Sequence, residues 1–463
     1  MRLQAAIAAG KLSSLASRVL GRGGGTALPG LVAERLAPDI VARLAGQLGQ
    51  GSALVSGTNG KTTTALMLSA MVTAAGLRPL HNRSGSNLMR GLAATFVAEA
   101  GVGGRLPGAE KRLGVLELDE AALPAAAKAT NPRVIALLNL FRDQLDRYGE
   151  VDIIADRWRE MIKGLPATTT LVLNADDPSV AGLGEGATGP VIYFGVDVPA
   201  LGGEREHAAD IRWCPRCGGE FEYSTVYYGH IGIWRCPTCG NSRPRPQVVV
   251  NGAEQEGFAG TSLVIDTPGG VVTAKTRLAG VYNIHNAAAA VAAGVALGLP
   301  IEALAAGLAG TGAAFGRQER FELEGKRVTI LLGKNPAGFN QLLRTLAAIP
   351  GTKHLALFLN DGIADGRDVS WIWDVDFERL KGQVASTVVS GRRAADLALR
   401  LRYGGVSEEM TIEEDLEAAL DRALANTAQG EDLYILPTYT AMLRVRELVA
   451  RRAKMPSYWE AER

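Results

Sequence analysis

The feature that most constrains this chain is a glycine-rich loop at residues 57–63, set between an apolar run and a helix-compatible segment. A phosphate-binding loop requires this order of strand, loop and helix, because its backbone N–H groups must curl around an anion. Gly57 and Gly60 permit the curl. Lys61 can reach the outer phosphates of a nucleotide, and the Thr62 hydroxyl can hold Mg²⁺. The glycine that opens the full pattern is replaced by valine, so we expect a shortened P-loop; a plain strand-to-helix turn is the alternative.

Length and charge exclude several classes of protein. With 463 residues, 47% of them hydrophobic, the chain can form two or three domains with large cores. A net charge of +1 argues against a nucleic-acid-binding surface, and no long uninterrupted apolar run indicates a transmembrane helix. Residues 1–50 are an expected N-terminal helical segment without a signal-peptide core, so we expect a cytoplasmic protein. We expect its first helix to pack on the following domain; contact with the inner face of the membrane is the alternative.

The part of the chain that follows alternates between apolar runs and helix-like segments. This alternation predicts a parallel sheet flanked by helices, in which ligands bind at the carboxyl ends of the strands. We expect the strands at residues 53–55, 113–118, 134–140, 170–173 and 191–194.

Polar residues follow several of these expected strands. Glu117 is best placed to hold Mg²⁺, whereas Asp119 and Glu120 fit solvated loop acids better. Asn174 and Asp176 follow another strand and could bind a base or ribose; an ordinary helix N-cap is the alternative. Several polar strand ends in one sheet favour a binding site over separate caps.

Four cysteines form two C-x₂-C pairs separated by 18 residues: Cys214, Cys217, Cys236 and Cys239. Four thiolates at this spacing predict a structural Zn²⁺ site, which leaves no open position for catalysis. We place this zinc ribbon in an insertion at about 205–250. A nucleic-acid-binding ribbon is the competing interpretation, but no basic stripe accompanies it.

The α/β pattern resumes after the ribbon. Asn283 and Asn286 open an alanine-rich helix, where they could cap it or face a nucleotide, and Arg317 could reach a phosphate. A third alternating unit begins at about residue 326. Its loop at 360–374 holds more acids, glycines and tryptophans than a connection needs; an acidic surface loop is the alternative.

These pieces together resemble the Mur ligases, ATP-dependent enzymes that form amide bonds in peptidoglycan synthesis. The resemblance spans about residues 50 to 450 and includes a polar segment from Asn139 to Asp146. It implies an α/β fold with a central P-loop domain at 51–325, carrying the zinc ribbon, and a smaller Rossmann-like domain at 326–463. It also implies cofactor-binding roles for Gly57, Thr58, Asn59, Gly60, Lys61, Thr62, Thr63, Asn174, Asp176, Asn283, Asn286 and Arg317.

Three departures narrow the resemblance: a short N-terminus without room for a UDP-binding domain, the four-cysteine insertion, and the C-terminal segments 334–338 and 365–374. With these departures, the chain resembles the branch of the family that amidates lipid II. Members of that branch work in a heterodimer with a GatD-like glutaminase subunit. The resemblance implies ATP-dependent conversion of D-glutamate to D-isoglutamine in the stem peptide, through an acyl phosphate and ammonia from the partner. A stand-alone Mur-like amino-acid ligase is the alternative. A zinc-ribbon interaction protein with a nucleotide switch is a third hypothesis.

The same resemblance assigns roles to individual residues. Lys61 and Glu117 would act on the transferring phosphoryl group, the latter with Mg²⁺. Because all four cysteines are assigned to zinc, none remains for glutamine hydrolysis. In the family an aspartate of the C-terminal domain completes the partner's Cys and His. The motif places it at Asp365, with Asp361 and Asp368 as close alternatives.

Overall fold

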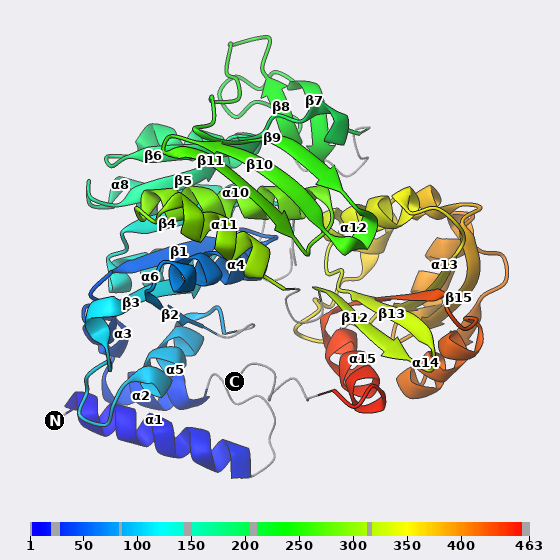
Figure 1. Ribbon diagram of the computed structural model, residues 1–463, viewed down its shortest axis with the longest axis horizontal. Coiled ribbons are helices and arrows are strands. Elements are labelled where there is room, and N and C mark those ends of the chain that lie inside the picture. The colour runs from blue at the N-terminus through cyan, green and yellow to red at the C-terminus, as the bar shows by residue number, and fades with distance from the viewer. Residues whose placement is uncertain are drawn as a thin grey trace.

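The computed structural model describes residues 2–19, 28–82, 86–142, 151–203, 211–312 and 317–455. Figure 1 shows two α/β bodies side by side, with the N-terminal helices below the larger body and a small hairpin above it. Within these ranges no helix combines the length and apolar character needed to cross a bilayer. The predicted domain boundaries at 50/51 and 325/326 stay predictions, and residues 313–316 lie outside the described ranges.

The larger body is built on a nine-stranded sheet of order β11-β10-β9-β6-β5-β4-β1-β3-β2. All pairs from β2 to β9 are parallel, and β10 and β11 add an antiparallel edge. The strands are β1 (Ser52–Ser56), β2 (Arg78–His81), β3 (Arg112–Glu117), β4 (Val134–Leu137), β5 (Thr170–Asn174), β6 (Val191–Val196), β9 (Val248–Gln255), β10 (Thr261–Thr267) and β11 (Gly270–Thr276).

Both faces of this sheet are covered, as the apolar runs of its strands require. Ala53 and Val55 point into one core with helices α4 (Lys61–Ala74), α10 (Val281–Ala296) and α11 (Ile301–Gly310). Leu54 points into the opposite core, because successive strand residues alternate between faces. That core contains α1 (Arg2–Val19), α2 (Leu28–Leu36), α3 (Ile40–Ala45), α5 (Met89–Glu99), α6 (Leu123–Thr130), α8 (Val151–Lys163) and part of α9 (Pro178–Ala181).

The first helix packs on the larger body, as expected. Leu3, Ala6 and Ile7 of α1 are buried in the same core as α5. The expected insertion contributes the antiparallel hairpin β7 (Glu222–Tyr228) and β8 (Ile231–Arg235) between β6 and β9.

The smaller body is a six-stranded sheet of order β12-β13-β17-β14-β15-β16, with only the β12–β13 pair antiparallel. Its two faces bury separate cores, one against α12 and α13 and the other against α14 and α15. The elements are β12 (Arg317–Leu323), β13 (Lys326–Leu331), α12 (Pro336–Ala348), β14 (Lys353–Phe358), β15 (Val384–Ser390), α13 (Ala394–Tyr403), β16 (Thr411–Glu413), α14 (Leu416–Ala425), β17 (Asp432–Pro437) and α15 (Tyr439–Arg452).

Candidate active site

The glycine-rich loop connects β1 to α4 with the geometry of an anion-binding turn. Gly57 has φ 142° and Gly60 has φ 89°, both in the region that favours glycine. A Cβ at Gly60 would lie 2.0 Å from Oδ1 of Asn286, so this position also leaves no room for a side chain. Helix α4 begins at Lys61, and the residues of its first turn, whose N–H groups have no partner within the helix, line the pocket described below.

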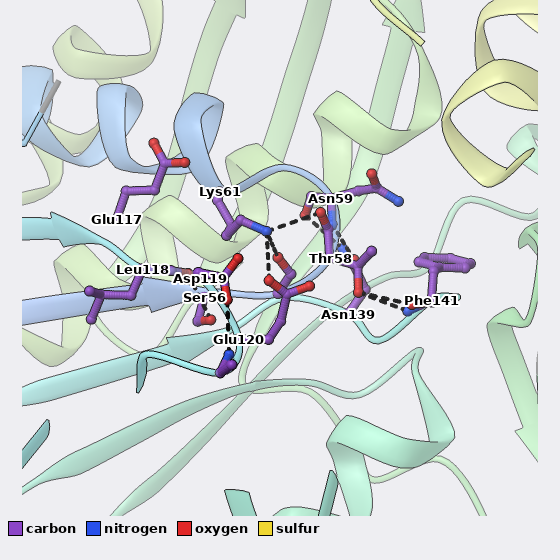
Figure 2. Close-up of polar contacts among 12 residues, drawn as sticks. Ser56, Thr58, Asn59, Lys61, Glu117, Leu118, Asp119, Glu120, Asn139 and Phe141 are labelled. Atoms are coloured by element: carbon purple, nitrogen blue, oxygen red, sulfur yellow. Dashed lines mark hydrogen bonds and ion pairs between the residues drawn. The ribbon is translucent and has the colours of Figure 1, made fainter. Parts of the chain in front are cut away.

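The side chain of Lys61 folds back over the loop (Figure 2). Its side chain is 8% exposed, and its Nζ donates to the carbonyl oxygens of Gly57 and Thr58 and to Oε2 of Glu120 at 3.0 Å. Burial opposes the charge of Lys61, but the Glu120 carboxylate holds the pKa of Lys61 above its ordinary value. Burial likewise opposes ionisation of Glu120, but the Lys61 charge holds the pKa of Glu120 below its usual value. The Lys61–Glu120 pair is therefore charged.

Glu117 ends β3 beside the first turn of α4. Thr62 Oγ1 donates to Glu117 Oε1 at 3.0 Å, while Glu117 Oε2 is buried without a hydrogen-bond partner. An ionised oxygen without a partner is costly in the interior unless a cation binds it. The hydroxyl of Thr62 and the carboxylate of Glu117 are hard oxygen ligands, so the residues present fit Mg²⁺.

Asparagines connect the loop to its neighbours. Asn59 N donates to Asn139 Oδ1 at 2.8 Å, and Asn139 Nδ2 returns a bond to Asn59 O at 3.0 Å. Thr58 Oγ1 pairs with both backbone polar groups of Phe141. The carboxyl end of β4 therefore fixes the outer side of the loop.

The loop forms one wall of a pocket of about 340 Å³ between the two bodies. Asn283 and Asn286 of α10 line it, with Asn286 Nδ2 donating to Asn283 Oδ1 at 3.0 Å. The smaller body contributes Lys334 and the first turns of α12. The predicted residues that line the pocket are Thr58, Asn59, Gly60, Lys61, Thr62, Thr63, Glu117, Asn283 and Asn286.

Asn174 and Asp176 do not line this pocket. Asn174 Nδ2 donates to Leu138 O, and its Oδ1 accepts from Asp176 N. Asp176 is fully buried, with Oδ1 accepting from Arg243 Nε at 2.6 Å and Oδ2 facing His285 Nε2 at 2.9 Å. These two residues belong to a buried polar network that connects the end of β5 to Leu138, Arg243 and His285. The side chain of Arg317 and the predicted polar residues 143–146 lie outside the described part of the chain.

The three candidate aspartates of the 360–374 loop have different surroundings. Asp365 is buried: Oδ1 accepts from Thr440 N at 2.8 Å, and Oδ2 accepts from Gly362 N and the Thr440 hydroxyl. Burial raises the pKa of Asp365. Asp361 pairs with Arg393 at 3.5 Å, and Asp368 is exposed and accepts from Ser370 N.

The four cysteines come together at the base of the ribbon hairpin. Their Sγ atoms all lie within 4.8 Å of one another, with Cys214–Cys239 at 3.7 Å and Cys217–Cys236 at 3.5 Å. A tetrahedral Zn²⁺ with Zn–S bonds of about 2.3 Å places its sulfurs about 3.8 Å apart. The cluster is therefore compatible with zinc.

Several residues that line the pocket were not predicted as site residues from the sequence. The sequence favours a solvated position for Glu120, but its side chain pairs with Lys61 and is only 13% exposed. Gln318 lines the pocket from a left-handed backbone position, φ 60°, and its amide pairs with the backbone N–H and carbonyl of Ala279. Tyr228 reaches the pocket from the ribbon hairpin. A third acid shortly after β3 is the local signal for Glu120, but it does not indicate the pairing with Lys61; no local pattern indicates Tyr228.

Comparisons with known proteins agree with this geometry. Residues 55–221 match the family model of the Mur ligase middle domain, and residues 332–442 match that of the MurT ligase C-terminal domain. The Staphylococcus aureus (strain COL) MurT subunit of lipid II isoglutaminyl synthase (glutamine-hydrolyzing) is 33% identical over 455 residues, covering 97% of this chain and 98% of that protein. The Streptococcus pneumoniae (strain ATCC BAA-255 / R6) subunit is 35% identical over 452 residues, 96% of each.

A solved structure extends the likeness to the fold. The pseudomurein peptide ligase type C from Methanothermus fervidus has a TM-score of 0.65 at 22% identity, covering 87% of this chain and 78% of that chain. At this level of identity the likeness concerns the fold alone.

Proposed function

This chain belongs to the Mur ligase family and, within it, to the MurT subunits, and from this premise we propose that it amidates lipid II. Membership makes it an ATP-dependent ligase and implies ATP and Mg²⁺. The proposed substrate group is the α-carboxyl of D-glutamate in the stem peptide, which becomes D-isoglutamine. The observation that carries the proposal is the pocket between the bodies, where Lys61, Thr62 and the half-paired Glu117 converge.

The proposed reaction has two steps, and the chain needs no covalent nucleophile for either. A carboxylate oxygen of the substrate attacks the γ-phosphorus of ATP, and ADP leaves, giving an acyl phosphate. Ammonia then attacks the acyl carbon, phosphate leaves, and the nitrogen loses a proton to give the amide. Lys61 and the N–H groups of the loop stabilise the charge on the transferring phosphoryl group.

Glu117 and Thr62 would hold Mg²⁺ at this site. A bound Mg²⁺ neutralises negative charge on the phosphates. Because Lys61 is already paired with Glu120, phosphates that bind the loop must compete with this carboxylate for the lysine. Asn139 keeps the loop in place during the exchange by its two bonds to Asn59.

We propose that ammonia comes from a GatD-like glutaminase subunit. All four cysteines of the chain lie in the ribbon cluster, where we propose that they bind structural Zn²⁺, so no thiol is left for glutamine hydrolysis. The smaller body exposes Trp373, within the 360–374 loop, and Tyr403, with their rings 5.7 Å apart. Exposed aromatic side chains in a cluster are typical of protein interfaces.

An aspartate of the 360–374 loop would complete the partner's catalytic residues. Asp365 is our proposal from the motif, although Asp361 and Asp368 carry the more exposed carboxylates. The three variants Asp361→Asn, Asp365→Asn and Asp368→Asn, each assembled with the glutaminase, separate these assignments. The aspartate in question is the one whose loss lowers glutamine hydrolysis while amidation with free ammonia continues.

Amidation of lipid II tests the proposal directly. The chain is supplied with lipid II, ATP and Mg²⁺, and with either ammonium or glutamine, in the presence and absence of a GatD-like glutaminase. We expect product from ammonium with the chain alone, and product from glutamine only when the glutaminase is present. ATP hydrolysis that depends on an added amino acid, without amidation under any condition, would instead support a stand-alone amino-acid ligase.

A further inference from the structure

The tip of the ribbon hairpin lies against the nucleotide loop. The ring of Phe141 lies 4.5 Å from the ring of His230 and 6.0 Å from that of Tyr228. The backbone of Phe141 in turn bonds Thr58 of the loop. A Cβ at Gly229 would lie 2.8 Å from this ring, so the tip is closely packed. The hairpin is therefore part of the pocket wall, although the cysteine cluster lies at its other end.

The hairpin is also fixed to the large sheet. Tyr227 is fully buried, and its hydroxyl donates to Val196 O at 2.6 Å. Trp234 Nε1 donates to Ala175 O at 3.0 Å, and Gly232 N donates to Asp176 O at 2.9 Å. These bonds join both strands of the hairpin to the ends of β5 and β6, so the hairpin moves with the larger body.

The carboxyl-terminal part of helix α12, in the smaller body, contacts this hairpin. The guanidinium of Arg344 donates to the carbonyl oxygen of Tyr227 and, at 2.6 Å, to that of Leu201. Leu201 closes the 3₁₀ turn Pro199–Leu201, which precedes the ribbon. A single planar group thus joins two separate segments of the larger body, a task that suits arginine better than lysine.

The other end of α12 contacts the nucleotide loop. Asn335 caps the helix, with its Oδ1 accepting from Gly338 N at 2.8 Å, while its Nδ2 donates to Asn59 Oδ1 at 3.2 Å. Arg344 lies nine residues further along, which corresponds to about 13 Å of helix. Because two points that far apart define the direction of an axis, α12 is oriented by the larger body at both ends.

We propose that the ribbon hairpin sets the position of the smaller body over the nucleotide pocket, with Arg344 as a positioning residue. The inference rests on the ATP-dependent ligase activity, but not on the identity of the acceptor. The pocket is lined by Gly338 and Gln341 of α12 and by Lys334, which lies two residues before the helix. A tilt of α12 would move these groups relative to Lys61, and small displacements of reacting groups lower rates strongly. The ribbon therefore has a function in assembling the active site beyond its own stability.

Arg344→Met removes both hydrogen bonds while keeping an unbranched side chain of similar length. We expect kcat to fall roughly tenfold to a hundredfold, while the dissociation constant for a non-hydrolysable ATP analogue changes less than about threefold. Small-angle X-ray scattering of the full chain with the analogue should show a larger radius of gyration. Arg344→Lys should recover only part of the loss, because an ammonium cannot bridge both carbonyls in the same geometry. Arg402→Met, at an exposed position of α13, is the matched control and should resemble the wild type.

A second variant tests the other end of α12. Asn335→Ser keeps an oxygen for the helix cap but is too short to reach Asn59, so it should also increase the radius of gyration in the scattering measurement. Zinc content and the thermal transition of each variant should match the wild type. Wild-type scattering and kcat in both variants would overturn the proposal, as would loss of zinc and of analogue binding together in Arg344→Met, which would make Arg344 a folding residue. The scattering comparison stands whether or not lipid II is the acceptor.

Discussion

The carboxyl ends of β3 and β5 belong to the same sheet, and both carry buried acids, but the two ends differ in how their oxygens are paired. Glu117 keeps Oε2 without a hydrogen-bond partner beside the nucleotide loop. Asp176 has both oxygens engaged, by Arg243, by His285 and by Val196 N at 2.9 Å. The first carboxylate has an oxygen left for a cation, and the second is already paired with the Arg243 guanidinium.

From this contrast we propose that Glu117 is a binding acid and Asp176 a structural one. A buried carboxylate whose lone pairs are all satisfied stabilises the fold and has nothing left to offer a ligand. A buried carboxylate with a free oxygen costs stability until a ligand arrives. The difference predicts which property each substitution changes: stability for Asp176 and activity for Glu117.

Asp176→Asn should have the largest effect. It removes the charge that partners Arg243 and His285 in the interior, so we expect a loss of roughly 3–5 kcal/mol in the free energy of unfolding. Asp197→Asn is the matched control, because Asp197 pairs with the same Arg243 at 2.8 Å but is 47% exposed. This control should lose no more than about 1 kcal/mol. Urea denaturation of both variants checks the prediction, and equal losses would contradict it.

Glu117→Gln should do the opposite. We expect ATP-dependent turnover to fall about 10²- to 10³-fold, because an oxygen that would hold Mg²⁺ beside the phosphates is lost. The melting temperature should stay within about 3 °C of the wild type or rise, since a half-paired carboxylate has been removed. Glu110→Gln, at an exposed position, is the control. A strongly destabilised Glu117→Gln protein with normal turnover per folded molecule would place Glu117 in the structural class.

Asp365 provides a third, smaller test. Like Asp176 it has both oxygens engaged, yet burial raises its pKa above the ordinary value of 3.8. The folded chain therefore binds the proton of the Asp365 carboxyl group more tightly than the unfolded chain does. The stability that this tighter binding contributes is present below pH 3.8 and is lost as the pH rises through the folded pKa.

Asp365→Asn should remove this dependence. The free energy of unfolding of the wild type minus that of the variant should fall as the pH rises from about 4 to about 7. Urea denaturation across that range measures the difference. A difference that grows with pH would show that the ionised carboxylate is stabilised in the folded chain, contrary to the burial argument.

Local patterns in the sequence predicted much of the architecture. They also indicated acids at both strand ends, but they did not distinguish Glu117 from Asp176. Alternating apolar runs indicated the strands, the glycine spacing indicated the loop, and the paired C-x₂-C motifs indicated the cysteine cluster. Polar residues after β3 and β5 gave the same signal in the sequence. What distinguishes them is the set of partners, and Asp176 finds His285 109 residues away in the chain.

Long-range packing also explains what the sequence could not show about the pocket. Glu120 is buried because the fold brings it against Lys61, which is 59 residues away in the chain. Tyr228 and Arg344 reach the pocket region from an insertion and from the smaller body, whose contact depends on the assembled fold.

In the proposed reaction this pocket activates a carboxylate by phosphorylating it, and the fate of an oxygen isotope in that carboxylate reveals whether it does. Lipid II carrying ¹⁸O in the α-carboxyl of D-glutamate is amidated with ATP, Mg²⁺ and ammonium, and the released phosphate is analysed by mass spectrometry. An acyl phosphate requires that a carboxylate oxygen leave with the phosphate, so we expect ¹⁸O-labelled phosphate in proportion to the amide formed. Amide formation with unlabelled phosphate would contradict the account.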